Sequence, residues 1–192
     1  MTYLFKIQIK GITRPPVWRK LAVPSDFTFL KFHSVIQTAF DWEDYHLFEF
    51  MDKEYQSNIR ISIPAEDNLF EFGYGVEAQD PSKTKLSDIF TNNVRKLLYI
   101  YDFGDNWVHE ITLEDTSDDK TKKAVCLSGK GACPPEDCGG TYGYEEMKNT
   151  FITSPDSEEA DEYRDWLGLE EGENWDANAF DIDIVNDYLK KI

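Results

Sequence analysis

The chain has few cysteines, no long apolar run and a deficit of positive charge. Three of its 192 residues are cysteines, Cys126, Cys133 and Cys138, too few for a disulfide framework in a chain of this length. No stretch approaches the roughly 20 apolar residues that span a bilayer. The first residues also lack the basic leader and apolar run of a secretory signal. We therefore expect a cytoplasmic protein with reduced thiols and no membrane partner.

Acidic residues outnumber basic ones, 37 to 20, which gives a formal net charge of −17. The first 40 residues are the exception, with six Lys or Arg side chains and one acid. Overall acidity repels nucleic-acid phosphates unless a basic face is segregated. Two alternatives stay open for the basic segment: it forms such a face, or it pairs internally with the acids. Its members are Lys6, Lys10, Arg14, Arg19 and Lys20.

Nucleotide-handling motifs are missing. Asp102-Phe103-Gly104 matches the magnesium tripeptide of kinases, but the chain has no kinase Gly-rich loop and no His-Arg-Asp catalytic loop. The segment 129–131 lacks the spacing of a phosphate-binding loop. The sequence therefore assigns no catalytic residue and favours a non-enzymatic role.

The strongest pattern lies at residues 96–113, KLLYIYDFGDNWVHEITL. Period-two alternation on both sides of a polar cluster predicts a hairpin with a five-residue connection. Alternation predicts further strands, and apolar residues at helical spacing after Thr28 predict a helix that this residue caps. The connection 64–95 is irregular apart from a short helical turn at 86–90. The other expected strands are 3–9, 17–23, 46–51 and 59–63.

The second half of the chain becomes helical. A charged loop at 115–123 and a Gly-, Pro- and Cys-rich irregular segment at 128–143 precede it. Apolar stripes then predict helices, one stopped by Gly168 and the last capped by Asp181. Strands first and helices later indicate an α+β fold, a mostly antiparallel sheet packed by helices. We expect one domain over 1–192, with the helical part 142–192 docked on the sheet.

Several polar side chains in this pattern could carry chemistry. His46, Asp102 and His109, with Asp105, would form an N/O set for a divalent metal if their strands are neighbours. Cys133 and Cys138 are further metal candidates, although their spacing does not match a structural zinc site. The alternative is structural: aspartates that bond turn amides, core histidines and buried thiols. No cofactor other than a divalent metal is suggested.

Several segments in fixed order resemble the plasmid pRiA4b ORF-3-like family. They are GITRPPVWR (11–19), WEDYHL (42–47), YDFGDNWVHE (101–110) and CPPEDCGGTYGY (133–144), with Trp166-Leu-Gly, Phe180-Asp and Val185-Asn in the tail. The resemblance implies a single α+β domain found on plasmids, mobile elements and microbial chromosomes, without an established activity. Relatives often have His-Leu-His where this chain has His46-Leu47-Phe48, which removes one potential ligand.

Three functions from different classes follow. The first is a non-catalytic interaction domain that binds an unknown protein partner, because aromatic side chains dominate protein interfaces. The second is a metal-dependent hydrolase that uses His46, Asp102, Asp105 and His109. The third is an accessory of DNA transactions, resolvase- or integrase-like, that uses the basic segment. The surface expected for the first comprises Asp102, Asp105, Trp107, Glu136, Asp137, Tyr142 and Tyr144.

Overall fold

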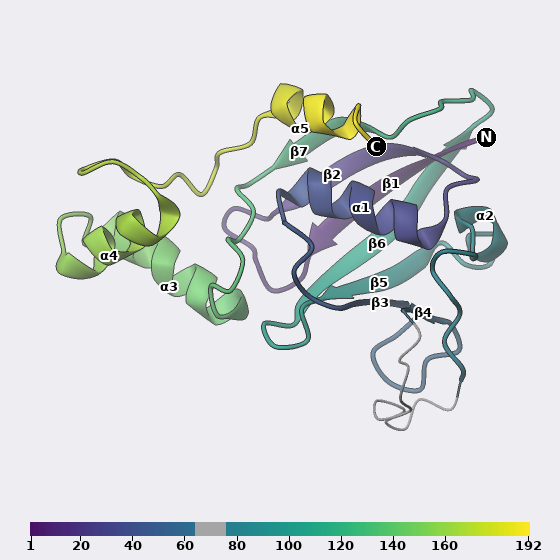
Figure 1. Ribbon diagram of the computed structural model, residues 1–192, viewed down its shortest axis with the longest axis horizontal. Helices are drawn as coiled ribbons and strands as arrows, with labels where there is room; N and C mark the ends of the chain where they lie inside the picture. Colours follow the sequence, from purple (N-terminus) through teal and green to yellow (C-terminus); the bar gives the residue numbers. More distant parts are fainter. Residues whose placement is uncertain (64–75) are drawn as a thin grey trace.

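A seven-stranded antiparallel sheet organises the computed structural model, which describes residues 1–63 and 76–192 (Figure 1). The strand order is β4-β3-β5-β6-β1-β2-β7. With the helices described below, this architecture confirms the predicted α+β class. The strands are β1 Thr2–Ile9, β2 Trp18–Pro24, β3 Phe48–Met51, β4 Arg60–Ser62, β5 Lys96–Tyr101, β6 Trp107–Ser117 and β7 Val125–Lys130.

The predicted hairpin is confirmed. β5 and β6 pair from Lys96↔Thr112 to Tyr101↔Trp107, and residues 102–106 connect them. Inward-facing residues of both strands are buried, whereas Glu110 at the opposite phase is exposed. This alternation is the period-two pattern of a sheet with one face against the core.

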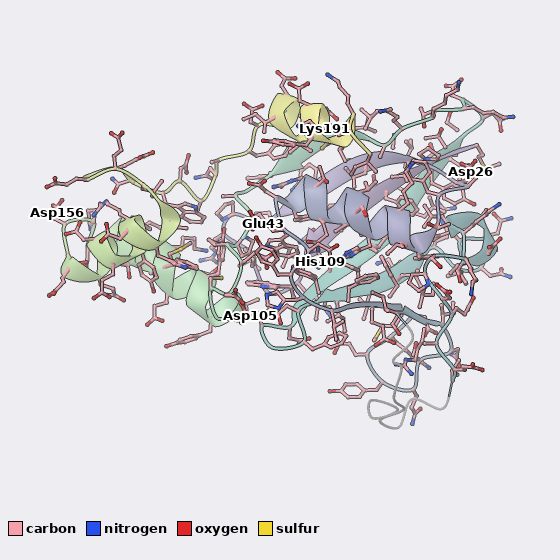
Figure 2. The ribbon with its side chains drawn as sticks, viewed as in Figure 1. Asp26, Glu43, Asp105, His109, Asp156 and Lys191 are labelled. Carbon is pink, nitrogen blue, oxygen red and sulfur yellow. The ribbon has the colours of Figure 1, made fainter. Side chains whose placement is uncertain are left out.

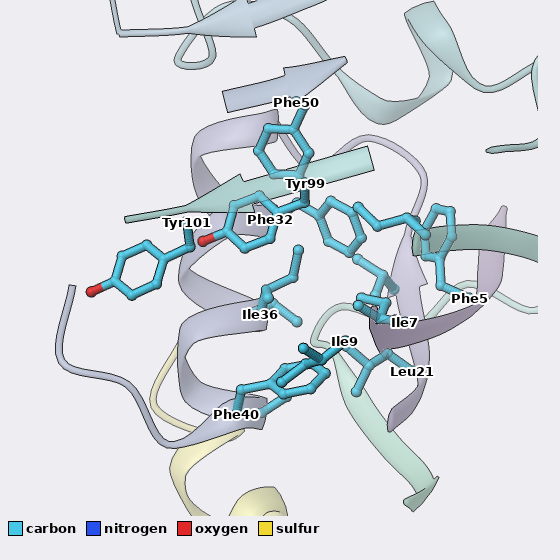
Figure 3. Packing of buried hydrophobic residues seen from close by; sticks show 14 of the residues in the cluster. Phe5, Ile7, Ile9, Leu21, Phe32, Ile36, Phe40, Phe50, Tyr99 and Tyr101 are labelled. Atoms are coloured by element: carbon cyan, nitrogen blue, oxygen red, sulfur yellow. The ribbon is translucent and has the colours of Figure 1, made fainter. Parts of the chain in front are cut away.

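Helix α1 (Phe29–Phe40) covers one face of the sheet (Figure 1). Thr28 caps it as predicted, because its hydroxyl accepts a hydrogen bond from the Lys31 amide. Phe32 and Phe40 are fully buried from the helix side, and they meet aromatic and aliphatic residues from the strands (Figure 3). Each such buried side chain stabilises the fold by about 1.5–3 kcal/mol.

Strand β7 was not predicted, since residues 128–130 fall in the segment expected to be irregular. Only Cys126 of this strand is buried, while Val125 and Leu127 are exposed. A strand on the edge of a sheet buries few residues, so its sequence pattern is weak. β6 likewise continues to Ser117, into the segment expected to be a charged loop.

The C-terminal part forms helices α3 (Gly140–Thr153), α4 (Glu158–Leu167) and α5 (Ile182–Leu189). The predicted caps are present, with Gly168 ending α4 and Asp181 starting α5. Helix α4 packs against α3 beyond one end of the sheet, whereas α5 lies beside β7 and α1 (Figure 1). Three residues of the predicted apolar stripes are exposed: Ile152, Trp166 and Tyr188.

The remaining described helix is α2 (Leu86–Ile89), at the predicted helical turn. Residues 64–75 of the connection expected to be irregular lie outside the described residues. Within residues 1–63 and 76–192, no helix is both long and apolar enough to cross a membrane.

Candidate functional site

Three segments that are distant in sequence meet at the end of the sheet that faces α3. They are the loop before β3, the β5–β6 turn and the loop that leads from β7 into α3. They bring together His46, Asp102, Glu136 and Asp137, which we call the His–carboxylate cluster. From His46, Nδ1 lies 3.8 Å from Asp102 Oδ1, and Nε2 lies 3.9 Å from Glu136 Oε2 and 3.1 Å from Asp137 Oδ1.

The loop that presents His46 is anchored by its main chain. The Glu43 amide donates to Glu136 Oε1 over 3.0 Å, and the Tyr45 amide donates to the Tyr101 hydroxyl over 3.0 Å. Glu43 and Asp105 both lie toward the end of the sheet that meets α3 (Figure 2). The backbone on the N-terminal side of His46 is therefore fixed to the other segments of the cluster.

A buried polar network holds the same loop from α1. Asp44, in the left-handed region with φ 60°, accepts from His33 Nε2 over 2.7 Å, and its amide donates to Gln37 Oε1 over 3.0 Å. The Tyr99 hydroxyl lies 2.9 Å from both His33 Nδ1 and Gln37 Nε2. Burial lowers the pKa of His33, so this histidine is neutral at pH 7. The network fixes Asp44 two residues before His46.

Asp102 performs the turn role expected from the sequence. Its Oδ1 accepts from the Gly104 amide over 2.8 Å, and its backbone has φ 54° in the left-handed region that aspartate tolerates. Its own amide donates to the Leu47 carbonyl over 3.0 Å, which joins the turn to the loop that carries His46. The Asp102 side chain is 11% exposed, so most of this carboxylate is removed from water.

Among the described residues, the hydrogen bonds to the Glu136 carboxylate all reach one of its two oxygens. Oε1 accepts from the Tyr101 hydroxyl over 2.9 Å and from the Glu43 amide over 3.0 Å. Burial raises the pKa of Tyr101, so the hydroxyl keeps its proton and donates it. The neighbouring Asp137 side chain is 68% exposed and marks the solvent side of the cluster.

Two buried atoms of the cluster lack hydrogen-bond partners among the described residues, His46 Nε2 and Glu136 Oε2. Asp137 Oδ1 is close to His46 Nε2 but does not form a hydrogen bond with it. A buried polar atom without a partner costs about 1–3 kcal/mol. These two atoms are therefore free to bind a ligand that enters between them.

The donor set suits a divalent cation. One ligand atom each from His46, Asp102 and Asp137 lie within 4.8 Å of one another. A first-row cation binds nitrogen and oxygen at about 2.0–2.2 Å, so its ligands are at most about 4.4 Å apart. The separations in the cluster exceed this limit by at most about 0.4 Å, so small side-chain movements would bring the three atoms to ligand distance of one cation.

His109 and Asp105, which the hydrolase hypothesis placed with His46, have other partners. His109 is fully buried between the Phe40 and Trp42 rings, and its Nδ1–H donates to the Trp107 carbonyl over 3.0 Å. Burial lowers the pKa of His109 to about 4. Asp105 Oδ2 accepts from the Gly139 amide over 3.0 Å. His109 thus lies in the core, as the structural alternative expected, whereas Asp105 bonds an amide of the loop before α3 instead of an amide of its own turn.

The cysteines also stand apart from the three-residue set. Burial raises the pKa of the Cys138 thiol to about 12 and raises that of Cys133 well above its ordinary value. Among the described residues, neither thiol belongs to the group formed by His46, Asp102 and Asp137. All three cysteines are free.

The expected recognition surface is divided by the structure. Trp107 and Tyr144 are completely buried, so they cannot serve as the surface anchors expected from the sequence. Tyr142, on the first turn of α3, is 78% exposed. Glu136 and Asp137 lie in the His–carboxylate cluster instead of forming a separate patch.

Sequence reasoning missed the histidine at position 33 and the contact of Asp137 with His46. The only local signal for His33 is its place on a helix among apolar residues, which is also typical of a core histidine. The Pro-Pro-Glu-Asp run at 134–137 indicates an irregular acidic loop, but it does not say which histidine the loop approaches. The contact between His46 and Asp137 joins positions 91 residues apart along the chain.

The fold and cluster thus define an α+β protein with a His–carboxylate site at one end of its sheet. The family model described as plasmid pRiA4b ORF-3-like protein matches residues 1–184, which confirms the resemblance. The chain is 32% identical to the uncharacterized protein y4hQ of Sinorhizobium fredii over 177 residues, 91% of this chain and 86% of that one. It is 37% identical to MM3350 of Methanosarcina mazei Go1, a protein of unknown function with a crystal structure, at a TM-score of 0.78 over 95% of both chains. The chain belongs to the plasmid pRiA4b ORF-3-like family.

Proposed function

We propose that the protein binds a divalent transition-metal ion through His46, Asp102 and Asp137. The observation that carries the proposal is the unpartnered His46 Nε2, which is buried beside the carboxylate oxygens of Glu136 and Asp137, while Asp102 Oδ1 lies on the Nδ1 side of the same ring. Such an arrangement places carboxylate oxygens and an imidazole nitrogen around one point. A cation at this point would satisfy both.

The ligand types set the class of metal. Imidazole suits zinc, copper, iron and nickel, carboxylates also suit manganese, and affinity at a mixed N/O site generally rises from manganese through cobalt to copper; calcium and magnesium prefer an all-oxygen shell. Glu136 Oε2 lies near enough to His46 to supply a further oxygen. We therefore expect Mn²⁺, Co²⁺ or Zn²⁺ to bind more tightly than Mg²⁺ or Ca²⁺.

The test is calorimetric titration of chelator-treated protein with each of these cations. The wild type should bind one equivalent of a transition metal. His46→Gln and Asp137→Asn should each lower the affinity by roughly tenfold or more, since even residues outside the ligand shell contribute 10–100-fold at such sites.

Glu43→Gln is the matched control. It removes one negative charge from the same loop, but Glu43 contributes only its backbone amide to the contacts of the cluster. This variant should bind the metal like the wild type. Equal loss of affinity in Glu43→Gln and Asp137→Asn would reduce the effect to general charge. A wild type without stoichiometric binding of Mn²⁺, Co²⁺ or Zn²⁺ would refute the proposal.

Binding of an unknown protein partner stays as a second candidate. It is favoured by the exposure of Tyr142, at 78%, close in sequence to Asp137. Tyr142→Ala should then remove specific partners from an affinity capture in the native host, while an exposed tyrosine elsewhere, Tyr55→Ala, should not. Identical captures from both variants would reject this role.

The DNA-accessory alternative gains no support from the basic segment. Lys10 pairs with Glu54 and Lys20 with Glu114, each at 2.8 Å. The buried Arg19 guanidinium donates to the Ala39, Lys130 and Gly131 carbonyls and stacks over the Phe180 ring. The two lysine pairs agree with the expected internal pairing with acids, and Arg19 is held inside the chain by carbonyls instead.

A further inference from the structure

The Tyr101 hydroxyl connects the residues that directly precede the three proposed ligands in the chain. Tyr101 directly precedes Asp102. Its hydroxyl accepts from the amide of Tyr45, which precedes His46, and donates to the carboxylate of Glu136, which precedes Asp137. We infer that Tyr101 is the positioning residue of the metal site. This inference rests on the proposed function.

The Tyr101 ring makes the hydroxyl a fixed point. The side chain is fully buried and stacks on Trp42 at a centroid distance of 4.9 Å. Trp42 is itself held, because its indole N–H donates to the Pro134 carbonyl over 2.8 Å. The hydroxyl points away from the hydrophobic cluster, toward the edge of the core (Figure 3). A rigid ring therefore carries one polar atom to the place where the three segments meet.

Both hydrogen bonds of the hydroxyl constrain a different ligand. The bond from the Tyr45 amide fixes the main chain next to His46, and the His46 ring also meets the Tyr101 ring edge-on at 5.8 Å. The bond to Glu136 holds Oε1 and so directs Oε2 toward His46 Nε2. Removal of the hydroxyl would leave the ligands present but free to separate.

The experiment compares Tyr101→Phe with the wild type in chelator-treated protein titrated with Co²⁺. The variant keeps the ring and loses only the oxygen. We expect its Co²⁺ affinity to fall roughly tenfold, as for other groups that orient metal ligands. At saturating Co²⁺ its visible absorption spectrum should also differ from the wild-type spectrum, because the ligand geometry has changed.

Tyr3→Phe is the control. The Tyr3 hydroxyl is also on a buried side chain and donates to the Phe90 carbonyl, away from the three segments. It should cost comparable stability and leave Co²⁺ affinity and spectrum unchanged. Equal effects of the two variants, or a Tyr101→Phe protein with wild-type affinity and spectrum, would overturn the inference.

Two further outcomes are separable. A wild type that binds no Co²⁺, Mn²⁺ or Zn²⁺ refutes the proposed function itself. If Tyr101→Phe does not fold, Glu136→Ala tests the same contact from its acceptor side and leaves the aromatic packing intact. Wild-type affinity and spectrum in Glu136→Ala would then contradict a positioning role that acts through Glu136.

Discussion

Acidification should destabilise the protein through His109, which sequence patterns made a candidate ligand and the structure places in the core. Burial lowers the pKa of this histidine from 6.5 to about 4. The folded state therefore keeps the ring neutral at a pH where the unfolded chain binds a proton. Stability is fully present above pH 6.5 and is lost as the pH falls through the interval between these two pKa values.

The magnitude follows from the shift. Each pKa unit corresponds to about 1.4 kcal/mol, so the fall in pKa from 6.5 to about 4 gives a full loss of about 3.4 kcal/mol, reached below pH 4. Roughly 1.4 kcal/mol should be lost by pH 5.5 and roughly 2.6 kcal/mol by pH 4.5. The side chain is fully buried, so solvent screening does not reduce these values substantially. Against a typical stability of about 5–15 kcal/mol, the effect is large.

The assay is urea unfolding at several pH values between 7.5 and 4.5, in chelator, for the wild type and His109→Phe. The stability of the protein also depends on pH through other groups, so only the difference between the two profiles is informative. The wild type should lose about 2.6 kcal/mol more than the variant by pH 4.5. Parallel profiles would refute the assignment of His109 as a buried neutral histidine.

Two further predictions concern the C-terminal part. Asn186 on α5 accepts from the Cys126 amide and donates to the Cys126 carbonyl, so Asn186→Ala should cost about 1–3 kcal/mol in urea unfolding, whereas the exposed Asp187→Ala should cost little. Truncation after Thr153 removes the buried Leu189 and the hydrogen bonds from Asn186 to the main chain of β7. The truncated protein should therefore be insoluble or molten. Cooperative unfolding of a monomeric truncated chain at an unchanged temperature would show that the tail is a separate module.

Local patterns predicted the parts of the fold that are decided locally. The β5–β6 hairpin alternates over a long stretch, and one register shift would expose a whole buried face, so its pairing follows from the sequence. The cap at Thr28 is equally local. Strand β7 escaped prediction because Gly129 lies where a larger side chain would collide with Phe180 and Arg19, and a glycine there resembles a loop residue. Packing from another part of the chain decides that position.

The sequence could predict the residues of the His–carboxylate cluster one by one, but not that they meet, because contacts between distant parts of the chain bring them together. Asp102 was expected to serve the turn, and it does so with one oxygen, but its place beside His46 depends on the Leu47 carbonyl that its amide meets. Asp137 reaches the same point because Gly140 packs against the Asp105 carbonyl, where an added Cβ would come within 2.7 Å. Neither contact has a signature in the neighbouring sequence.

The hairpin and the proposed site are connected through one strand position. Tyr101 is the last residue of β5 and pairs with Trp107, so its place is set by the most strongly patterned pairing in the chain. Its hydroxyl hydrogen-bonds Tyr45 and Glu136, and so holds the residues directly before His46 and Asp137 in place. Loops gain precision when they are bonded to rigid elements, because each bond removes freedom that a ligand would otherwise have to restrict. The polar residues at 102–106 follow β5 because this end of the sheet positions three loops around the proposed metal site.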